Sequence, residues 1–155
     1  GMALAAASPA WAGCSDPGRP DVDWRRCYFN EQVLIEVDLT GANLRGASFN
    51  RADLTGANFT GVRAYGIKFN SAVLKGAIFT KAELQEADFT RAELAGASFQ
   101  EADLRRAQFF RADLKGANLA GAQLVGANFS QADLTGALWT DGKTKCGEGS
   151  IGACR

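Results

Sequence analysis

A five-residue period runs without a break in phase from Phe29 to Trp139, and it constrains this chain more than any other feature. Every fifth residue in this stretch is Leu, Phe or Trp, and the one exception is Ala64. An α-helix repeats every 3.6 residues and a flat strand every two, so neither places every fifth side chain on one face. The period therefore fixes the architecture almost by itself, but it names no partner and no substrate.

The five-residue units share a composition as well as a spacing. The units at 52–56 (ADLTG), 57–61 (ANFTG) and 132–136 (ADLTG) each contain Ala, then Asp or Asn, then Leu or Phe, then two further residues. This pattern closely resembles the repeat of pentapeptide-repeat proteins over about residues 27–141. The resemblance implies an all-β solenoid, a right-handed quadrilateral parallel β-helix. Each coil would hold four pentapeptides, one on each face, which gives about six coils.

A second, longer period recurs at every fourth repeat and supports four pentapeptides per coil independently of the resemblance. Repeat centres that are four pentapeptides apart form a column, and we call the four columns faces 1 to 4. Faces 1 and 2 are uniform and form the predicted structural core: Phe29, Phe49, Phe69, Phe89, Phe109 and Phe129 on face 1, and Leu34, Leu54, Leu74, Leu94, Leu114 and Leu134 on face 2. Face 3 contains Leu39, Phe59, Phe79, Phe99, Leu119 and Trp139, and face 4 contains Leu44, Ala64, Leu84, Leu104 and Leu124. Phe-rich and Leu-rich walls should therefore alternate around a narrow square interior.

Ala64 is expected to be a compensated defect of face 4. Its neighbours at the small inward position, two residues before each centre, are Val62 and Ile67 instead of alanine. The added carbons roughly replace those that Ala64 lacks, so we predict no functional cavity at this position.

The residue two after each centre makes a corner, and two of the corners differ in composition. Between faces 2 and 3 these residues are Glu36, Gly56, Gly76, Gly96, Gly116 and Gly136, and between faces 1 and 2 they are Glu31, Arg51, Ser71, Arg91, Arg111 and Gln131. We predict that the Gly-rich corner needs a positive φ, as a type II turn does, and that the Gly-free corner does not.

The charges and residue types of the chain argue against nucleic-acid binding, membrane insertion and catalysis. Lys plus Arg and Asp plus Glu balance at 17 each, so no net field attracts nucleic acid or an anionic membrane. Histidine is absent, and the sequence contains no nucleophile–base pair, metal-ligand cluster or phosphate-binding glycine loop. No apolar run is long enough to cross a bilayer. We expect no catalytic residues, no metal, no cofactor, no nucleic-acid partner and no membrane insertion.

Four cysteines lie outside the repeats or at their edge. Pairing by proximity joins Cys14 to Cys27 and Cys146 to Cys154, because the two other connectivities would have to bridge the whole solenoid. Two disulfides indicate an oxidising compartment. The flanking residues also resemble those of exported bacterial members of the family. We therefore expect a periplasmic or secreted protein whose capped ends keep it monomeric, with end-to-end dimers as the alternative.

The chain is expected to divide into four segments. Residues 1–12 read as a tag scar (Gly1) followed by a signal-peptide remnant or flexible tail, with Ala10-Trp11-Ala12 as the cleavage site. Residues 13–28 form the N-terminal cap, 29–141 the β-helix and 142–155 the disulfide-bonded C-terminal cap.

Several outward positions form columns of like residues. Asn30, Asn50 and Asn70 recur on face 1, and Thr40, Thr60 and Thr80 recur on face 3. We interpret both columns as hydrogen-bonded ladders between coils. An ice-ordering array is the alternative for the threonines, but Gln100 and Ala120 interrupt that column.

Exposed apolar residues are the candidate partner surface, with Tyr65, Val73, Ile78 and Phe110 as the leading candidates. The function we expect is a non-catalytic scaffold or protein-binding module of the bacterial periplasm, with the partner unknown. The alternative, drawn from the same family, is a DNA mimic that binds and protects DNA gyrase, a type II topoisomerase. An acidic column, Asp53, Glu93, Asp113 and Asp133, favours this alternative, but the neighbouring Arg and Lys residues weaken it.

Overall fold

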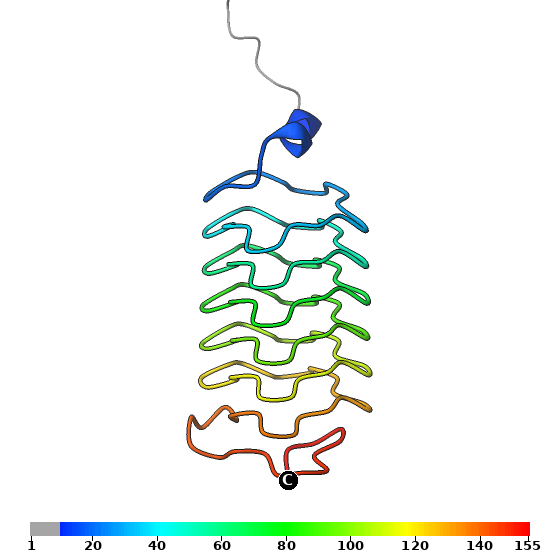
Figure 1. Cartoon of the computed structure of the whole chain (residues 1–155). Helices are drawn as coiled ribbons and strands as arrows, with labels where there is room; N and C mark the ends of the chain where they lie inside the picture. The colour runs from blue at the N-terminus through cyan, green and yellow to red at the C-terminus, as the bar shows by residue number, and fades with distance from the viewer. Residues whose placement is uncertain (1–9) are drawn as a thin grey trace, which may run out of the picture.

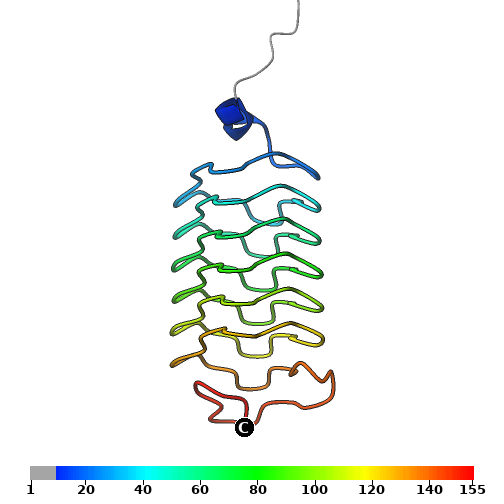
Figure 2. The same ribbon diagram turned by 180° about the vertical axis from the view of Figure 1, so that it is seen from behind.

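The computed structural model describes residues 10–155 and shows a stack of square coils, the predicted right-handed quadrilateral parallel β-helix (Figures 1 and 2). A short 3₁₀ helix, η1 (Ala10–Ser15), lies above the first coil, and the C-terminal segment lies beneath the last. In this part of the chain the strands are reduced to single-residue bridges. The expected tag scar and signal-peptide remnant lie, for residues 1–9, outside the described residues.

The bridges confirm the register of four pentapeptides per coil. The parallel bridges run from Asp23↔Asn43 to Asn118↔Leu138, and every one joins a residue to its counterpart four pentapeptides later. Each repeat centre before the last coil donates its N–H to the following coil, as Leu44 does to the carbonyl of Arg63 at 2.7 Å. The ladder starts at Asp23, within the segment expected to form the N-terminal cap.

The backbone ladder explains why Asp or Asn precedes the repeat centre. The amide of the residue after the centre is the one N–H in a regular pentapeptide that the backbone hydrogen bonds leave unpaired. The preceding Asp or Asn accepts it: Thr90 donates its N–H to Oδ1 of Asp88 at 3.0 Å, and Thr60 donates to Asn58 at the same distance. Such a side chain satisfies a backbone donor that would otherwise lack a partner.

The interior consists of stacked rings and leucines, as the columns predict. Phenylalanines of face 1 stack at short range, with the ring centroids of Phe89 and Phe109 4.9 Å apart and their planes 2° apart. Across the axis they meet the rings of face 3 edge-on, as Phe89 meets Phe99 at 5.5 Å and 86°. Both are favourable arrangements for aromatic pairs.

The predicted core residues are buried except at the two ends of the stack. Leu34 and Phe129 are only partly buried, because they lie in the first and last coils where no further coil covers them. Ala64 is fully buried together with Val62 and Ile67, as the compensation of volume requires.

The prediction that only the Gly-rich corner needs a positive φ is wrong. Arg51, Ser71 and Arg91 on the Gly-free corner have φ of 59°, 56° and 57°, close to the 68° of Gly56. All four corners therefore make the same left-handed turn, whatever residue occupies them. The ladder on either side fixes this backbone conformation, so a non-glycine residue there adopts it despite the steric cost.

Cys14 is joined to Cys27 at the N-terminal end, as the proximity of the two residues predicted. The adjacent Trp24 is buried, packs on Phe29 with ring centroids 4.1 Å apart and planes tilted by 36°, and donates its indole N–H to the carbonyl of Asp16. The residues between η1 and the first coil pack tightly on this ring, since a Cβ at Gly18 would lie 2.6 Å from Val37 and 3.1 Å from Trp24.

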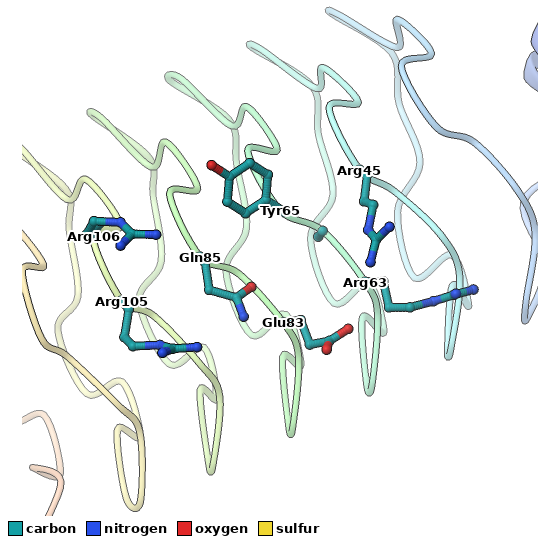
Figure 3. Close-up of a pocket in the computed structure, with 8 residues that line it drawn as sticks. Arg45, Arg63, Tyr65, Glu83, Gln85, Arg105 and Arg106 are labelled. Carbon is teal, nitrogen blue, oxygen red and sulfur yellow. The ribbon is translucent and has the colours of Figure 1, made fainter.

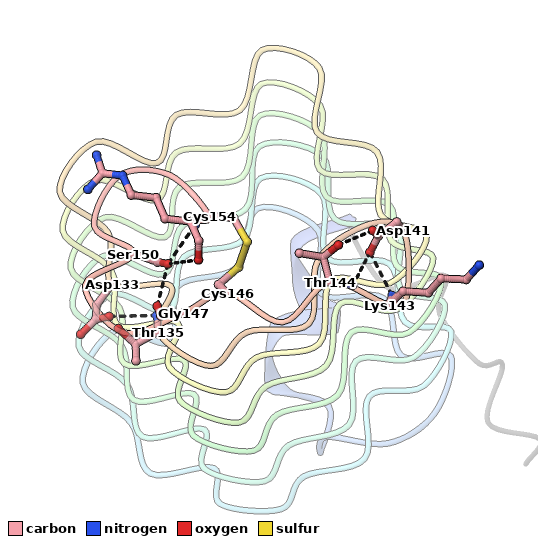
Figure 4. Close-up of a disulfide and its surroundings, with 10 residues drawn as sticks. Asp133, Thr135, Asp141, Lys143, Thr144, Cys146, Gly147, Ser150 and Cys154 are labelled. Carbon is pink, nitrogen blue, oxygen red and sulfur yellow. Dashed lines mark hydrogen bonds between the residues drawn. A yellow bond between two sulfur atoms is a disulfide. The ribbon is translucent and has the colours of Figure 1, made fainter.

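The C-terminal segment folds back under faces 2 and 3 of the last coil (Figure 4). It forms antiparallel bridges, Leu138↔Lys145 and Asp133↔Ile151, and the second predicted disulfide, Cys146–Cys154, holds it closed. Ser150 is fully buried there, and its hydroxyl donates to the carbonyl of Gly147 at 2.7 Å.

Asp141 closes the turn that leads into this cap. Its carboxylate accepts the hydroxyl of Thr144 at 2.5 Å and the backbone N–H groups of Thr144 and Lys143. These bonds, the Thr144 hydroxyl first, lower the pKa of Asp141 to about 2.

Candidate functional site

The four apolar or aromatic candidates lie on four different faces of the rod. Tyr65 is on face 4, Val73 on face 2, Ile78 on face 3 and Phe110 on face 1. Tyr65 is 51% exposed and Ile78 38%, whereas Val73 and Phe110 are partly buried. The Arg111 guanidinium also covers Phe110, 5.2 Å from the ring centroid. The structure therefore does not bring these residues together into one surface.

The asparagine column of face 1 is the predicted ladder between coils. Asn70 donates its backbone N–H to Oδ1 of Asn50 at 2.9 Å, and Asn50 donates in the same way to Asn30. Asn30 and Asn50 thus accept the amides that Ser48 and Lys68, which replace the usual Asp or Asn, leave unpaired.

The threonine column is not a ladder between coils, which corrects the prediction. Thr40 and Thr60 donate their hydroxyls to Asp38 and Asn58 of their own pentapeptides, both at 2.6 Å. The Asp or Asn side chain that accepts the amide also accepts the hydroxyl, because both donors belong to the same residue. The column therefore follows from the local turn.

Lysines neutralise part of the acidic column of face 2. Lys75 pairs with Glu93 at 3.7 Å and Lys115 with Asp113 at 3.6 Å. Asp53 and Asp133 each accept the amide of the threonine two residues further on. Two members of the column are thus paired with lysines and two are engaged in turns, so it is not a uniform acidic stripe.

Face 4 has a hollow at Ala64 (Figure 3), where the sequence predicted no functional cavity. The hollow is an open groove of about 390 Å³ over Ala64, lined by Arg45, Arg63, Ala64, Tyr65, Glu83, Gln85, Arg105 and Arg106. Arg45 and Arg63 lie at one end and Arg105 and Arg106 at the other, with Tyr65 and Gln85 between them. The adjacent corner is open, since a Cβ built at Gly66 meets nothing within 4 Å. We call this feature the face-4 groove.

The two arginine pairs of the face-4 groove differ in their neighbours. Arg105 pairs with Asp103 at 2.7 Å, and Arg106 with Glu86 at 3.8 Å. The guanidiniums of Arg45 and Arg63 form no ion pair or hydrogen bond with any residue of 10–155. The groove is therefore basic, and its N-terminal end carries the least neutralised charge.

Further polar groups of the groove are held in fixed positions. The Tyr65 hydroxyl donates to the carboxylate of Glu86, and Gln85 donates its side-chain amide to Asp103 at 2.8 Å. The Arg105 side chain, more than any other group, lowers the pKa of the Asp103 carboxyl. Asp103 therefore stays ionised near neutral pH and acts as a fixed charge.

Two backbone amides in the groove lack the side-chain acceptor that Asp or Asn supplies in other pentapeptides. Arg63 and Glu83 occupy the position from which an Asn or Asp, such as Asn58 or Asp88, accepts the amide two residues further on. As a result, the N–H groups of Tyr65 and Gln85 make no hydrogen bond within the described part of the chain. The groove thus combines four guanidiniums, an exposed tyrosine and two available N–H donors.

A second hollow of about 400 Å³ follows the corner between faces 1 and 2. Its lining residues are all polar or charged: Asn30, Glu31, Asn50, Arg51, Asn70, Ser71, Thr90 and Arg91. The asparagines are already bonded to one another, and Arg51 lies 4.0 Å from Glu31. This hollow therefore offers fewer groups for a partner than the face-4 groove.

The family profile described as pentapeptide repeats (8 copies) matches the chain at residues 25–61, 33–70, 67–106 and 102–138. These segments together span most of the chain. The chain belongs to the pentapeptide-repeat family. No curated protein matches it significantly in sequence.

Solved structures of other pentapeptide-repeat proteins are similar to this one. One from the thylakoid lumen of Arabidopsis thaliana is 31% identical over 64% of this chain and 66% of its own, slightly less than two thirds, with a TM-score of 0.46. Rfr23 of the cyanobacterium Cyanothece is 24% identical over 74% and 88% of the two chains, with a TM-score of 0.48. QnrB1, a plasmid-mediated fluoroquinolone resistance protein, is 25% identical over 74% and 66%, with a TM-score of 0.37.

Two features are absent from residues 10–155 of this pentapeptide-repeat protein. No helix in this range is both long and apolar enough to cross a membrane. In the same range, no three or more Cys, Asp or Glu side chains lie together as a group that could hold a metal ion.

Proposed function

We propose that this pentapeptide-repeat protein is a non-catalytic protein-binding module of the bacterial periplasm and that it recognises its partner through the face-4 groove. The observation that carries the proposal is Tyr65, half exposed on a side wall between two pairs of arginines. Tyrosine and arginine dominate the binding energy of protein interfaces. A wall braced by the bridge ladder also loses little conformational entropy when a partner binds.

The compartment is proposed from the disulfides. Cys14–Cys27 and Cys146–Cys154 each close one end of the stack. Disulfides in such structural positions persist in oxidising compartments and are rare in the cytosol. Fractionation of cells that express the full-length protein tests this part, and recovery from the cytosol with four reduced thiols would refute it.

A binding role suits the groove better than acid–base catalysis. A general acid or base that works near neutral pH needs a pKa close to that pH. The pKa of Asp103 is instead lowered, first by the hydrogen bond from Arg105, so this carboxylate holds no proton to give. The carboxylates here contribute charge and position.

Site-specific photo-crosslinking in living cells tests recognition by face 4. A photoreactive residue replaces Tyr65 in the groove, and in a matched control it replaces Ala95, which has the same place in a pentapeptide of face 2. We expect a covalent adduct with a protein at position 65 and none at position 95. Adducts at position 95 alone, or at neither position, would refute recognition through face 4.

The alternative, a DNA mimic that binds gyrase, predicts an acidic stripe along the rod. Lys75 and Lys115 interrupt the column on face 2 that comes nearest to such a stripe. No contact or distance on that face favours the alternative over the module proposed above. A gyrase supercoiling assay with the purified protein tests it directly, and protection from a fluoroquinolone would support it.

A further inference from the structure

The charge of the face-4 groove indicates the chemistry of its ligand. Its lining contains four arginines and one carboxylate, Glu83. Asp103 and Glu86 at its edge pair with Arg105 and Arg106, whereas the two arginines at the N-terminal end have no ion-pair partner among residues 10–155. Guanidiniums bind carboxylates through strong, charge-assisted hydrogen bonds. The amides of Tyr65 and Gln85 add two donors that have no hydrogen-bond partner among residues 10–155. A ligand that fits is anionic and presents hydrogen-bond acceptors.

The spacing of the arginines indicates the shape of the ligand. Arg45 and Arg105 occupy the same position in their pentapeptides and lie three coils apart on one face. At about 4.8 Å per coil, their backbones are separated by about 14 Å along the axis. An extended peptide rises about 3.4 Å per residue and presents alternate residues on one side. Two side chains four residues apart therefore share a side and lie about 14 Å apart.

We infer that the face-4 groove binds an extended acidic segment of a partner protein, which runs along the rod with carboxylates four residues apart facing Arg45 and Arg105. The residue midway between the carboxylates contacts Tyr65 and Gln85. This inference rests on the proposed function and names the chemistry of the partner.

A nucleic acid fits the same groove less well. Its closely spaced phosphates would pass the carboxylates of Glu83, Glu86 and Asp103, which lie within the groove or at its edge. The balanced charge of the whole chain also provides no field to draw a polyanion in. A protein segment can instead place its carboxylates only where the arginines stand.

Peptide binding tests the inference, with fluorescence anisotropy of labelled nine-residue probes at low salt. The matching probe, GSETLTESG, has two glutamates four residues apart. Its isomer GSETLETSG has the same composition with the glutamates three apart, and GSQTLTQSG has no charged side chain. We expect the matching probe to bind about tenfold more tightly than the isomer, whose second carboxylate points away from the rod, and more tightly still than the uncharged probe.

The matched variants are Arg45→Gln with Arg105→Gln on face 4, and Lys75→Gln with Lys115→Gln on face 2. Both pairs remove two positive charges from the same position of a pentapeptide. We expect the face-4 pair to weaken binding of the matching probe about 100-fold and the face-2 pair to leave it unchanged. Thermal melting of both proteins shows that they are folded.

Three results would overturn the inference: no binding of the matching probe, an equal loss in the two double variants, or tighter binding of an oligothymidylate than of the matching probe. The crosslinking experiment separates this failure from that of the proposed function. If position 65 crosslinks to a protein but the matching probe does not bind, the acidic segment is wrong and face 4 remains the recognition surface. Without an adduct at position 65, the proposed function fails first.

Discussion

The corner turns give a sharp test of what holds the coils in shape. Gly96 has a φ of +70°, and Arg91, five residues earlier on the Gly-free corner, has a φ of +57°. We predict that Gly96→Ala destabilises the protein and that Arg91→Gly stabilises it. Neither substitution disturbs other contacts. A Cβ at Gly96 meets nothing within 4 Å, and the Arg91 side chain forms no hydrogen bond or ion pair within residues 10–155.

The magnitudes follow from the backbone conformation alone. An L-residue in the left-handed region costs about 1–2 kcal/mol. Alanine also restricts the unfolded chain, which returns about 0.4–1 kcal/mol. The net loss for Gly96→Ala is therefore about 1 kcal/mol, equal to a fall of about 3 °C in melting temperature for a chain of this size. Arg91→Gly reverses the same terms and should raise the free energy of unfolding by up to about 1 kcal/mol.

Calorimetry and urea unfolding of the two variants beside the wild type measure these changes. The sign of the Arg91→Gly effect is decisive. If the Gly-free corner did not need a positive φ, glycine there would only add flexibility and would destabilise the protein. A neutral Gly96→Ala or a destabilised Arg91→Gly protein would refute the reasoning.

Four further predictions concern the core, the turns and the caps. Ala64→Leu should lower the free energy of unfolding by about 1–3 kcal/mol through overpacking, and a higher melting temperature would contradict the compensation of volume. Asp88→Ala should cost about 1–2 kcal/mol in urea unfolding because Thr90 loses the acceptor of two hydrogen bonds, whereas Glu93→Ala, which removes no such acceptor, should be nearly neutral. The folded pKa of Asp141 is below the usual carboxyl value of about 4, so its carboxylate stabilises the protein fully above that pH and loses this effect as the pH falls towards 2. Asp141→Asn should therefore make the melting temperature depend less on pH in this range. Reduction of both disulfides should lower the melting temperature and convert monomers to end-to-end oligomers in sedimentation analysis, and an unchanged size and melting curve would argue against the caps.

The fold could be predicted because one physical constraint acts in the same way on every repeat. Because a large side chain must fill a narrow square interior, an apolar residue recurs in every pentapeptide. Because that side chain stacks on its counterpart in the next coil, similar residues recur in every fourth pentapeptide. Phe89 and Phe109 can be predicted to stack because they are four pentapeptides apart in the sequence. The ends were less predictable, since burial of Leu34 or Phe129 depends on residues that follow no period.

The corners and the threonine column show where composition misleads. Glycine at a corner indicates a positive φ there. Arginine at another corner does not indicate a negative φ, because the surrounding ladder imposes the same turn. Thr60 and Thr80 belong to one column, yet the Thr60 hydroxyl is fixed by Asn58 of its own turn. A column of identical residues can arise from a local motif repeated in each coil.

The face-4 groove could not be predicted from apolar residues and net charge. Its arginines stand at three different positions of the pentapeptide, so no single column contains them all. Arg63 and Glu83 stand where 11 of the 24 units centred on residues 24–139 carry Asp or Asn, but 13 units, including these two, lack it. This departure alone therefore does not mark the groove.

Because each coil contains four pentapeptides, the length of this rod can change without disturbing its faces only by whole coils. Duplication of one whole coil would lengthen the rod, keep every column on its own face and move Arg105 one coil further from Arg45. Insertion of a single pentapeptide would preserve the five-residue rule but turn everything after it by a quarter of a revolution. Arg105 would then stand on face 1, and rings would stack on leucines. Variation in length that preserves a binding face is therefore confined to whole coils.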